Sequence, residues 1–263
     1  MKSIQYHIKA IIEVINQLTK GRFLMYFIPG LVITTIYFWL TYRASSLLNV
    51  TGFLERIPLV GGYLDQGFEA TVGVISFLFD QIYIFAIITL LSPFNTHLSE
   101  KLDTQLTGQK FEGGFGRIIN DLVRMIIIVI ISIVLEFFLL GFWWIISWIF
   151  GIPDLVYTIV SFLMAAFFFG FSFYDHSLER YKKGVFGSLG FAFQKMLMVI
   201  ITGSIFLALY YFPYQNGTPY IGIFIAPVLT TMISTVVYLY YLKKLPKEIT
   251  VQNTETTNEQ IIE

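Results

Sequence analysis

The short stretch TKGRF, Thr19 to Phe23, holds the residues best suited to bind an anion. Arg22 can hold an oxyanion through two parallel hydrogen bonds, and Lys20 adds a second positive charge. Gly21 lets a ligand approach the backbone, and the start of a helix supplies free N–H groups. Lys20, Gly21 and Arg22 therefore form the candidate oxyanion site. The alternative is that these charges only anchor the end of a membrane helix.

A second set of polar residues lies inside apolar segments. Asp80 and Gln81 are near the middle of one such segment, and Glu136 is in the middle of the next. An ionised carboxylate in a bilayer costs about 2.5–3.5 kcal/mol or more, so such residues usually line a cavity, pair or carry protons. One interpretation is a polar path through the membrane. The other, favoured for Glu136, is a protonated carboxyl group hydrogen-bonded to a neighbouring helix.

The sequence holds no constellation of residues for catalysis. It has no Cys, which excludes thiolate chemistry, and its His residues lack the i, i+4 spacing of a metal site. Nucleophile, phosphate-loop and metalloprotease motifs do not occur either. We therefore expect no enzyme activity, no metal and no cofactor. The formal net charge of zero says nothing about partners, and we expect no nucleic acid among them.

Composition indicates a membrane protein. The chain of 263 residues is 56% hydrophobic and 13% charged, whereas soluble domains are about 25% charged. Its apolar residues gather in segments long enough to cross a bilayer as helices. These segments span about residues 23–42, 70–92, 122–150, 155–174, 196–211 and 221–242. We expect an all-α polytopic membrane protein with one integral membrane domain, residues 1–245, and a polar, disordered tail, residues 246–263.

The arrangement of these segments predicts further elements. An amphipathic helix at about residues 3–19 comes first, either lying in the membrane interface or packed on the rest of the protein. The last four segments form two helical hairpins, because only short turns separate their members. The segment at about 196–211 is shorter than the ~30 Å hydrocarbon core requires. The hairpins therefore cross the membrane either fully or in part.

Lys and Arg residues predict the orientation. The N-terminal stretch, the loops after the second and fourth segments, and the tail together hold fifteen of the 17 Lys and Arg residues. Arg43 and Arg56 fall on the other side. Both termini are therefore expected to face the cytoplasm.

The end of the second segment shows a sharp change of character in the stretch LLSPFNTHLSEKLDTQLTG, Leu90 to Gly108. Pro93 disfavours helix at the residue before it, and Asn95 is a good N-cap for a new helix. Leu then recurs every four residues, and Gly108 can end the helix. The sequence predicts that one helix ends at Pro93, the chain turns, and an amphipathic helix begins.

This stretch resembles the corresponding segment of the CysZ-type sulfate permeases, a family that shares a domain with eukaryotic etoposide-induced membrane proteins. The stretches Phe173–Lys195 and Ile225–Leu239 are similar to the family's Asp-containing loop with its short amphipathic helix and to its last helix. The resemblance covers roughly residues 5–245. The shared turn and helix motif is carried here by Pro93, Phe94, Asn95, Glu100, Leu106 and Gly108.

The resemblance implies a fold and a function. The family's fold has an N-terminal interfacial helix, two long transmembrane helices and two hairpins that only partly penetrate the membrane, and it assembles as a homo-oligomer. Its activity is sulfate uptake through the inner or plasma membrane for cysteine biosynthesis. Its sulfate site precedes the first membrane span, where Lys20, Gly21 and Arg22 stand here. The alternative function is a membrane scaffold or assembly protein of the same fold, without transport.

Overall fold

The computed structural model describes residues 2–47, 67–109, 115–216 and 218–245. It describes the backbone alone at residues 37, 38, 40–42, 44–47, 67–81, 115–118, 214, 219 and 220. The predicted tail, 246–263, lies outside the described residues. The described part is almost wholly helical and contains no strand. Its elements are α1 (Lys2–Thr19), η1 (Leu24–Tyr26), α2 (Phe27–Leu47), α4 (Gly67–Thr107), α5 (Phe115–Phe150), α6 (Asp154–Arg180), α7 (Val185–Gln194), α8 (Met196–Gln215) and α9 (Pro219–Tyr241).

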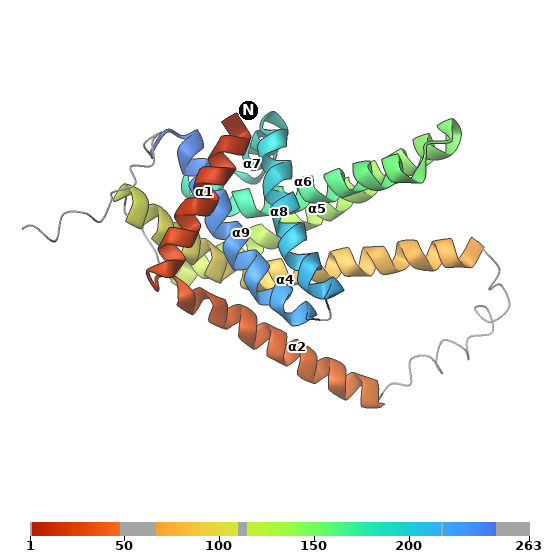
Figure 1. Ribbon diagram of the computed structural model, residues 1–263, viewed down its shortest axis with the longest axis horizontal. Helices are drawn as coiled ribbons and strands as arrows, with labels where there is room; N and C mark the ends of the chain where they lie inside the picture. The colour runs from red at the N-terminus through yellow and green to blue at the C-terminus, as the bar shows by residue number, and fades with distance from the viewer. Residues whose placement is uncertain (1, 48–66, 110–114, 217, 246–263) are drawn as a thin grey trace, which may run out of the picture.

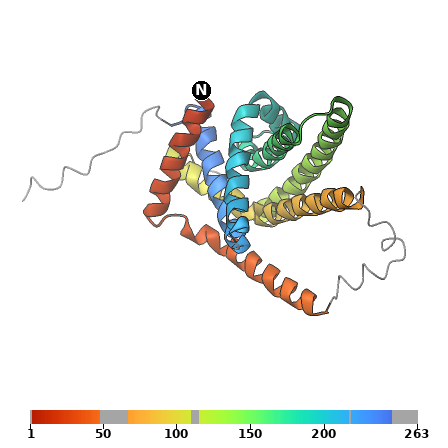
Figure 2. The ribbon, with the colours of Figure 1, turned by 45° about the vertical axis from the view of Figure 1, so that its right-hand side comes forward.

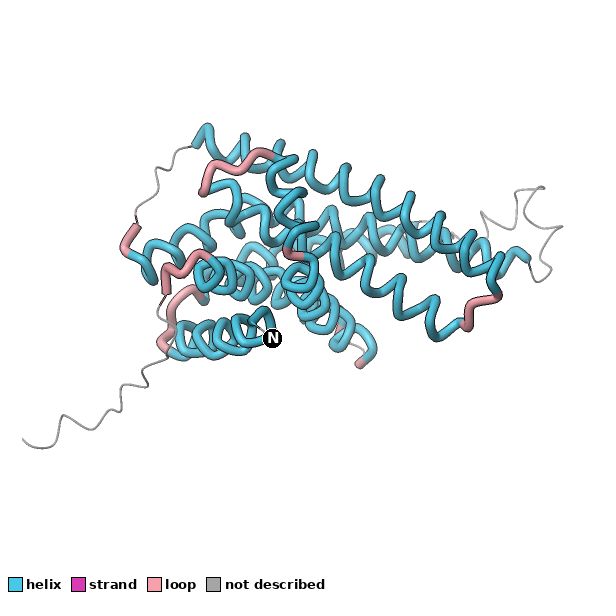
Figure 3. Tube along the Cα trace, turned by 90° about the horizontal axis from the view of Figure 1, so that it is seen from above, coloured by secondary structure: helices cyan, strands magenta, loops and turns pink. Residues whose placement is uncertain are grey.

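The helices form a bundle around α8 and α9 (Figure 1). Helix α1 lies against α9, α2 runs along another side, and the α5–α6 hairpin extends beyond the body of the bundle. Figure 2 and Figure 3 show this hairpin from two other directions. Its far end exposes large apolar side chains such as Phe138, Trp148 and Phe150. Such a surface suits a hydrocarbon solvent rather than water.

The prediction of an all-α polytopic membrane protein is confirmed at this level. Within the described residues, five helices are long and apolar enough to cross a membrane. They are Ile82–Thr107, Ile119–Phe150, Asp154–Arg180, Met196–Pro213 and Ile221–Tyr241. Helix α8 has 20 residues, about 30 Å at 1.5 Å per residue, so its length does not prevent a full crossing.

The predicted helix break at Pro93 is wrong. Helix α4 runs without interruption through Pro93 from Gly67 to Thr107, so Asn95 is inside a helix and is not an N-cap. The proline removes one backbone donor, the one that would bond to the carbonyl of Thr89. A break at this depth would instead expose several N–H and C=O groups to an apolar surrounding, which costs more. The predicted end of the helix at Gly108 is confirmed, since Gly108 adopts φ 73° and its N–H bonds to Thr104 O at 2.8 Å.

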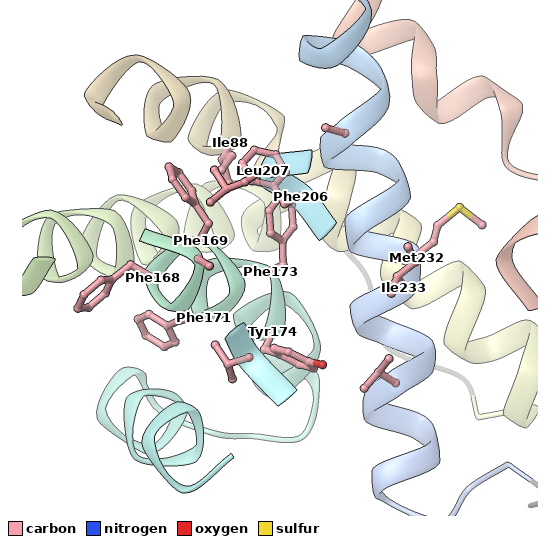
Figure 4. Packing of buried hydrophobic residues seen from close by; sticks show 14 of the residues in the cluster. Ile88, Phe168, Phe169, Phe171, Phe173, Tyr174, Phe206, Leu207, Met232 and Ile233 are labelled. Carbon is pink, nitrogen blue, oxygen red and sulfur yellow. The ribbon is translucent and has the colours of Figure 1, made fainter. Parts of the chain in front are cut away.

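Aromatic side chains fill the centre of the bundle (Figure 4). The ring of Phe169 on α6 stacks on Phe85 of α4 with centroids 4.5 Å apart, and it meets Phe206 of α8 at 5.3 Å. Phe173, one turn further along α6, also contacts Phe206, at 4.9 Å. The three helices thus share one continuous aromatic core.

Small residues let α6 and α8 cross at very short range. A Cβ atom on Gly203 would overlap the carbonyl oxygen of Ala166, and one on Gly170 would overlap that of Val199. Close backbone approach through small residues is a common basis of helix packing in membranes. Gly141 on α5, by contrast, has open space where a Cβ would stand.

We predict that Gly203→Ala destabilises the protein and that Gly141→Ala does not. Overpacking a tight contact costs about 1–3 kcal/mol, whereas replacing an open helical Gly gains up to about 1 kcal/mol. The measurement is the melting temperature of each variant in detergent, taken as the temperature at which heating removes half of the monodisperse peak in size-exclusion chromatography. Equal melting temperatures for the two variants would contradict the close crossing.

Helix α1 packs on the bundle through one face and leaves an apolar face exposed. His7 is buried, with its Nδ1 2.7 Å from Ser3 O and its Nε2 2.8 Å from Thr202 Oγ1 on α8. The Thr202 hydroxyl in turn bonds to Tyr174 OH on α6 at 3.0 Å. The exposed face carries the row Ile4, Ile8, Ile12 and Ile15. The interpretation that this helix packs on the protein is confirmed, and the exposed apolar stripe leaves its position in a membrane interface a prediction.

Stability should fall in mild acid because of His7. Burial lowers the pKa of His7, outweighing the raising effect of its bond to Ser3. In the unfolded chain the His7 side chain takes up a proton near pH 6.5, whereas in the folded chain it does so only at lower pH. The full free energy of unfolding is therefore present above pH 6.5, and it falls as the pH decreases below this value. Melting temperatures from pH 8 to 5 should therefore drop more steeply for the wild type than for His7→Gln. Parallel curves would exclude this role of His7.

Candidate functional site

The predicted oxyanion site lies in the turn between α1 and η1. Gly21 adopts φ 70°, its N–H bonds to Leu18 O at 2.9 Å, and the Arg22 N–H bonds to Gln17 O at 3.3 Å. This pair of bonds is the Schellman arrangement that ends a helix with glycine in the left-handed region. The expectation that these two N–H groups are open to a ligand is therefore wrong, because both are used to close α1.

The side chains of Lys20 and Arg22 are exposed. Arg22 Nη1 donates to Gln17 Oε1 at 3.4 Å, and the same oxygen accepts from Gln105 Nε2 on α4 at 2.6 Å. Gln17 also donates to Glu13 Oε1 at 2.6 Å. The guanidinium is thus held loosely on one side and tied to the last turns of α4, while its other N–H groups can meet a ligand from solvent.

The motif residues of α4 have different surroundings. Phe94 is exposed, Pro93 and Glu100 are half-buried, and Asn95 is buried. Asn95 is followed at a spacing of four residues by Ser99 and then by Asp103. This spacing puts the three polar side chains on one face of the helix.

Three helices that meet inside the bundle carry buried polar side chains toward one another. We call this set the polar seam. Ser99 hydrogen-bonds to Thr235 of α9 and lies 3.4 Å from Ser177 Oγ of α6, and Thr96 Oγ1 is 3.2 Å from His176 Nδ1. The polar seam comprises Asn95, Thr96, Ser99 and Asp103 of α4, His176, Ser177 and Arg180 of α6, and Thr231 and Thr235 of α9.

The charged part of the seam is a fully buried ion pair. Arg180 Nη2 lies 3.4 Å from Asp103 Oδ2, and neither side chain is exposed. Arg180 also donates to Ser99 and, at 3.3 Å, to Ser177. Tyr181 OH donates to Asp103 Oδ2 at 2.9 Å, and burial together with the charge of Asp103 raises the pKa of Tyr181, so its hydroxyl stays protonated. These bonds offset the large cost of removing both charges from water.

The seam reaches the protein surface at one end. Lys244, just after α9, donates to Tyr181 OH at 3.0 Å and also bonds to Gln109. Lys244 is exposed. Hydrogen bonds lead from Lys244 to Tyr181 and on to Asp103, and the ion pair of Asp103 with Arg180 continues this series into the interior.

A second ion network joins α5 to α6. Arg124 donates from Nε and Nη2 to the two carboxylate oxygens of Asp175, at 2.8 and 2.7 Å. Glu179 Oε2 lies 3.8 Å from Arg124 Nε, and Arg124 Nη2 also donates to Ser188 Oγ of α7 at 3.1 Å. The fold brings Asp175 to Arg124 from 51 residues away along the chain.

The polar path of Asp80, Gln81 and Glu136 stays a prediction. Glu136 is buried on α5, a helix that contributes no residue to the polar seam. The side chains of Asp80 and Gln81 are not among those that the structure describes.

Sequence reasoning missed Asp103 and Arg180, the central pair of the seam. A signal for Asp103 was present, since Asn95, Ser99 and Asp103 share a helical face. The Leu residues on the neighbouring face were taken as the buried stripe instead. Arg180 was counted among the loop charges that set orientation, because it stands at the end of an apolar segment.

Among the described residues, no group of three His, Cys, Asp or Glu side chains is placed to hold a metal ion. No protein-family model matches the chain, and no curated protein is significantly similar to it.

The Asp103–Arg180 pair should show strong coupling in a double-mutant cycle. Asp103→Asn or Arg180→Met alone leaves one buried charge without its counter-charge, and we expect each to cost about 3–5 kcal/mol. The double variant should cost clearly less than the sum, because neither charge remains. The measurement is the free energy of unfolding in denaturant for all four proteins. Additive losses would contradict a direct pair.

Proposed function

We propose that the protein is a permease that carries sulfate or a related oxyanion across the inner or plasma membrane into the cytoplasm, acting as a homo-oligomer with both termini cytoplasmic. The observation that supports this most is the polar seam, a row of hydroxyl, amide, imidazole and guanidinium groups between membrane-spanning helices. Buried polar groups in such helices usually line the route of a substrate or ion. The resemblance to sulfate permeases supports the same substrate class.

The chemistry of the seam suits an oxyanion. Sulfate offers only acceptor oxygens, so its carrier must supply donors. Asn95 Nδ2, His176 Nε2 and Thr231 Oγ1 are buried and have no hydrogen-bond partner within the described part of the chain. Unused buried polar groups are costly, and they persist where a ligand or water can use them. Arg180 adds positive charge nearby, partly balanced by Asp103.

The Lys20–Arg22 turn is the proposed contact for the anion at the cytoplasmic side. It lies at the protein surface, and the Gln17–Gln105 bond connects it to α4, the helix that contributes Asn95, Ser99 and Asp103 to the seam. An exposed guanidinium can hold an oxyanion at this surface without a deep pocket.

A scaffold or assembly protein without transport is the second candidate. The observation that favours it is the set of bonds from Ser99 and Tyr181 to the pair of Asp103 and Arg180, which suits a network that only holds helices together. The two candidates differ in one direct measurement. Radiolabelled sulfate should enter proteoliposomes faster than protein-free vesicles if the protein is a permease, and no faster if it is a scaffold.

Isosteric changes in the seam separate transport from structure. We expect Thr231→Val to slow sulfate flux while leaving the melting temperature unchanged or raised, because the lost hydroxyl has no partner within the described residues. Thr235→Val should lower the melting temperature, because that hydroxyl bonds to Ser99. Normal flux through Thr231→Val would contradict a route along the seam.

Variants at Arg22 test the cytoplasmic contact separately. Arg22→Ala should lose about 1.5–3 kcal/mol of sulfate binding free energy, and Arg22→Lys should also weaken binding because two-pronged geometry is lost. Lys20→Ala should cost less and depend more on salt. The measurement is calorimetry in detergent at fixed ionic strength. Wild-type affinity in Arg22→Ala would place the site elsewhere.

A further inference from the structure

Helices α6 and α9 end in a strained conformation that glycine would relieve. Lys182 and Lys243 both adopt φ 58°, the left-handed region that side chains other than glycine enter at a cost. The next residues, Lys183 and Lys244, donate their N–H groups to Leu178 O and Leu239 O at 3.1 and 3.0 Å. The end of α1 has the same geometry but uses glycine. Two helix ends therefore keep a lysine where glycine would be cheaper.

One of these lysines, Lys244, and a further one, Lys195, lie over one group of aromatic rings. The Tyr238 ring lies 5.3 Å from Tyr181 and 6.1 Å from Tyr241, measured between centroids. Lys244 Nζ stands 4.3 Å from the Tyr181 ring, and Lys195 Nζ stands 5.1 Å from the Tyr241 ring. Lys182 and Lys183 follow Tyr181 directly in the chain, and Lys243 precedes Lys244, so three separate chain segments bring lysines to the neighbourhood of these rings. We call this lysine cluster Lys182, Lys183, Lys195, Lys243 and Lys244.

Helix α7 places apolar side chains beside the lysine cluster. It connects the end of α6 to the start of α8 (Figure 1), and both neighbours are membrane-spanning. One face packs inward through Ser188 and Phe191. The other exposes Phe186 and Phe193, which are 81% and 46% accessible. An exposed apolar stripe with flanking lysines at the end of membrane helices is the pattern of a segment lying among lipid headgroups.

We propose that this end of the bundle binds an anionic phospholipid, with the headgroup phosphate held by the lysine cluster and the acyl chains lying along Phe186 and Phe193. The strained Lys182 and Lys243 are explained by this role, because glycine would end the helices but could not hold a phosphate. The proposal requires that the helices span a membrane and does not depend on transport.

The test uses the full chain in detergent with soluble short-chain lipids. Native mass spectrometry should show phosphatidylglycerol binding and little phosphatidylcholine binding. Each lysine removed should weaken phosphatidylglycerol binding about fivefold, the effect of one lysine at an anionic surface. The double variant Lys182→Gly/Lys243→Gly should therefore bind about 25-fold more weakly, yet melt at the same or a higher temperature because the backbone strain is gone. Lys101→Gln, an exposed lysine on α4, is the matched control.

Several outcomes would overturn the proposal. Equal binding of the two lipids, or unchanged phosphatidylglycerol binding by the double glycine variant, would show that the lysines only complement the negative ends of the helices. If the double glycine variant lost melting temperature and lipid affinity together, the lysines would likewise have a structural role and not a lipid-binding one. Displacement of phosphatidylglycerol by millimolar inorganic phosphate, with no effect of Phe186→Ser, would indicate a site for a free oxyanion instead.

Discussion

The buried pair of Asp103 and Arg180 constrains the arrangement of the helices around it more than any other contact. Each charge costs several kcal/mol to remove from water, so the pair persists only with further hydrogen bonds in good geometry. Those bonds come from Ser99 on α4, from Ser177 on α6 and from Tyr181 just after it. Sliding or turning either helix would leave a charge unbonded. The pair therefore fixes both the depth and the rotation of α4 against α6.

The same demand for satisfied polar groups acts on the backbone. Within an apolar surrounding a helix keeps its own hydrogen bonds, so α4 continues through Pro93 and loses a single bond rather than a whole turn. Apolar contact alone gives helices in a bilayer little reason to associate. Close packing at Gly170 and Gly203 supplies part of what holds them together, and the stacked rings of Phe85, Phe169 and Phe206 supply another part.

Local patterns in the sequence predicted the helices, but they could not predict contacts between residues far apart in the chain. Apolar length and the helical spacing of Ile residues depend on neighbouring residues, so the N-terminal helix and the last two long helices were placed within about four positions. Helix α5 begins seven residues earlier, and α6 ends six residues later, than the apolar segments that predicted them. The ion pairs were not predicted, because Arg124 and Asp175 stand 51 residues apart and no local pattern links them. At Pro93 a rule derived from helices in water was applied to a helix that is long and apolar enough to cross a membrane. Gly21 was assigned to a ligand, although the end of α1 requires its positive φ.

The two parts of the candidate site meet on the last turns of α4. Gln105 holds the Gln17 side chain that Arg22 contacts, and Asp103, two residues earlier, holds Arg180. An oxyanion on Arg22 would compete with Gln17 for the guanidinium and so alter a bond network anchored on Gln105. Because Asp103 is fixed by the same helical turn, a shift of that turn would also change the geometry around Arg180. The surface turn and the buried seam are therefore mechanically connected through a few residues of one helix, which is the arrangement a carrier needs if binding at its surface is to change its interior.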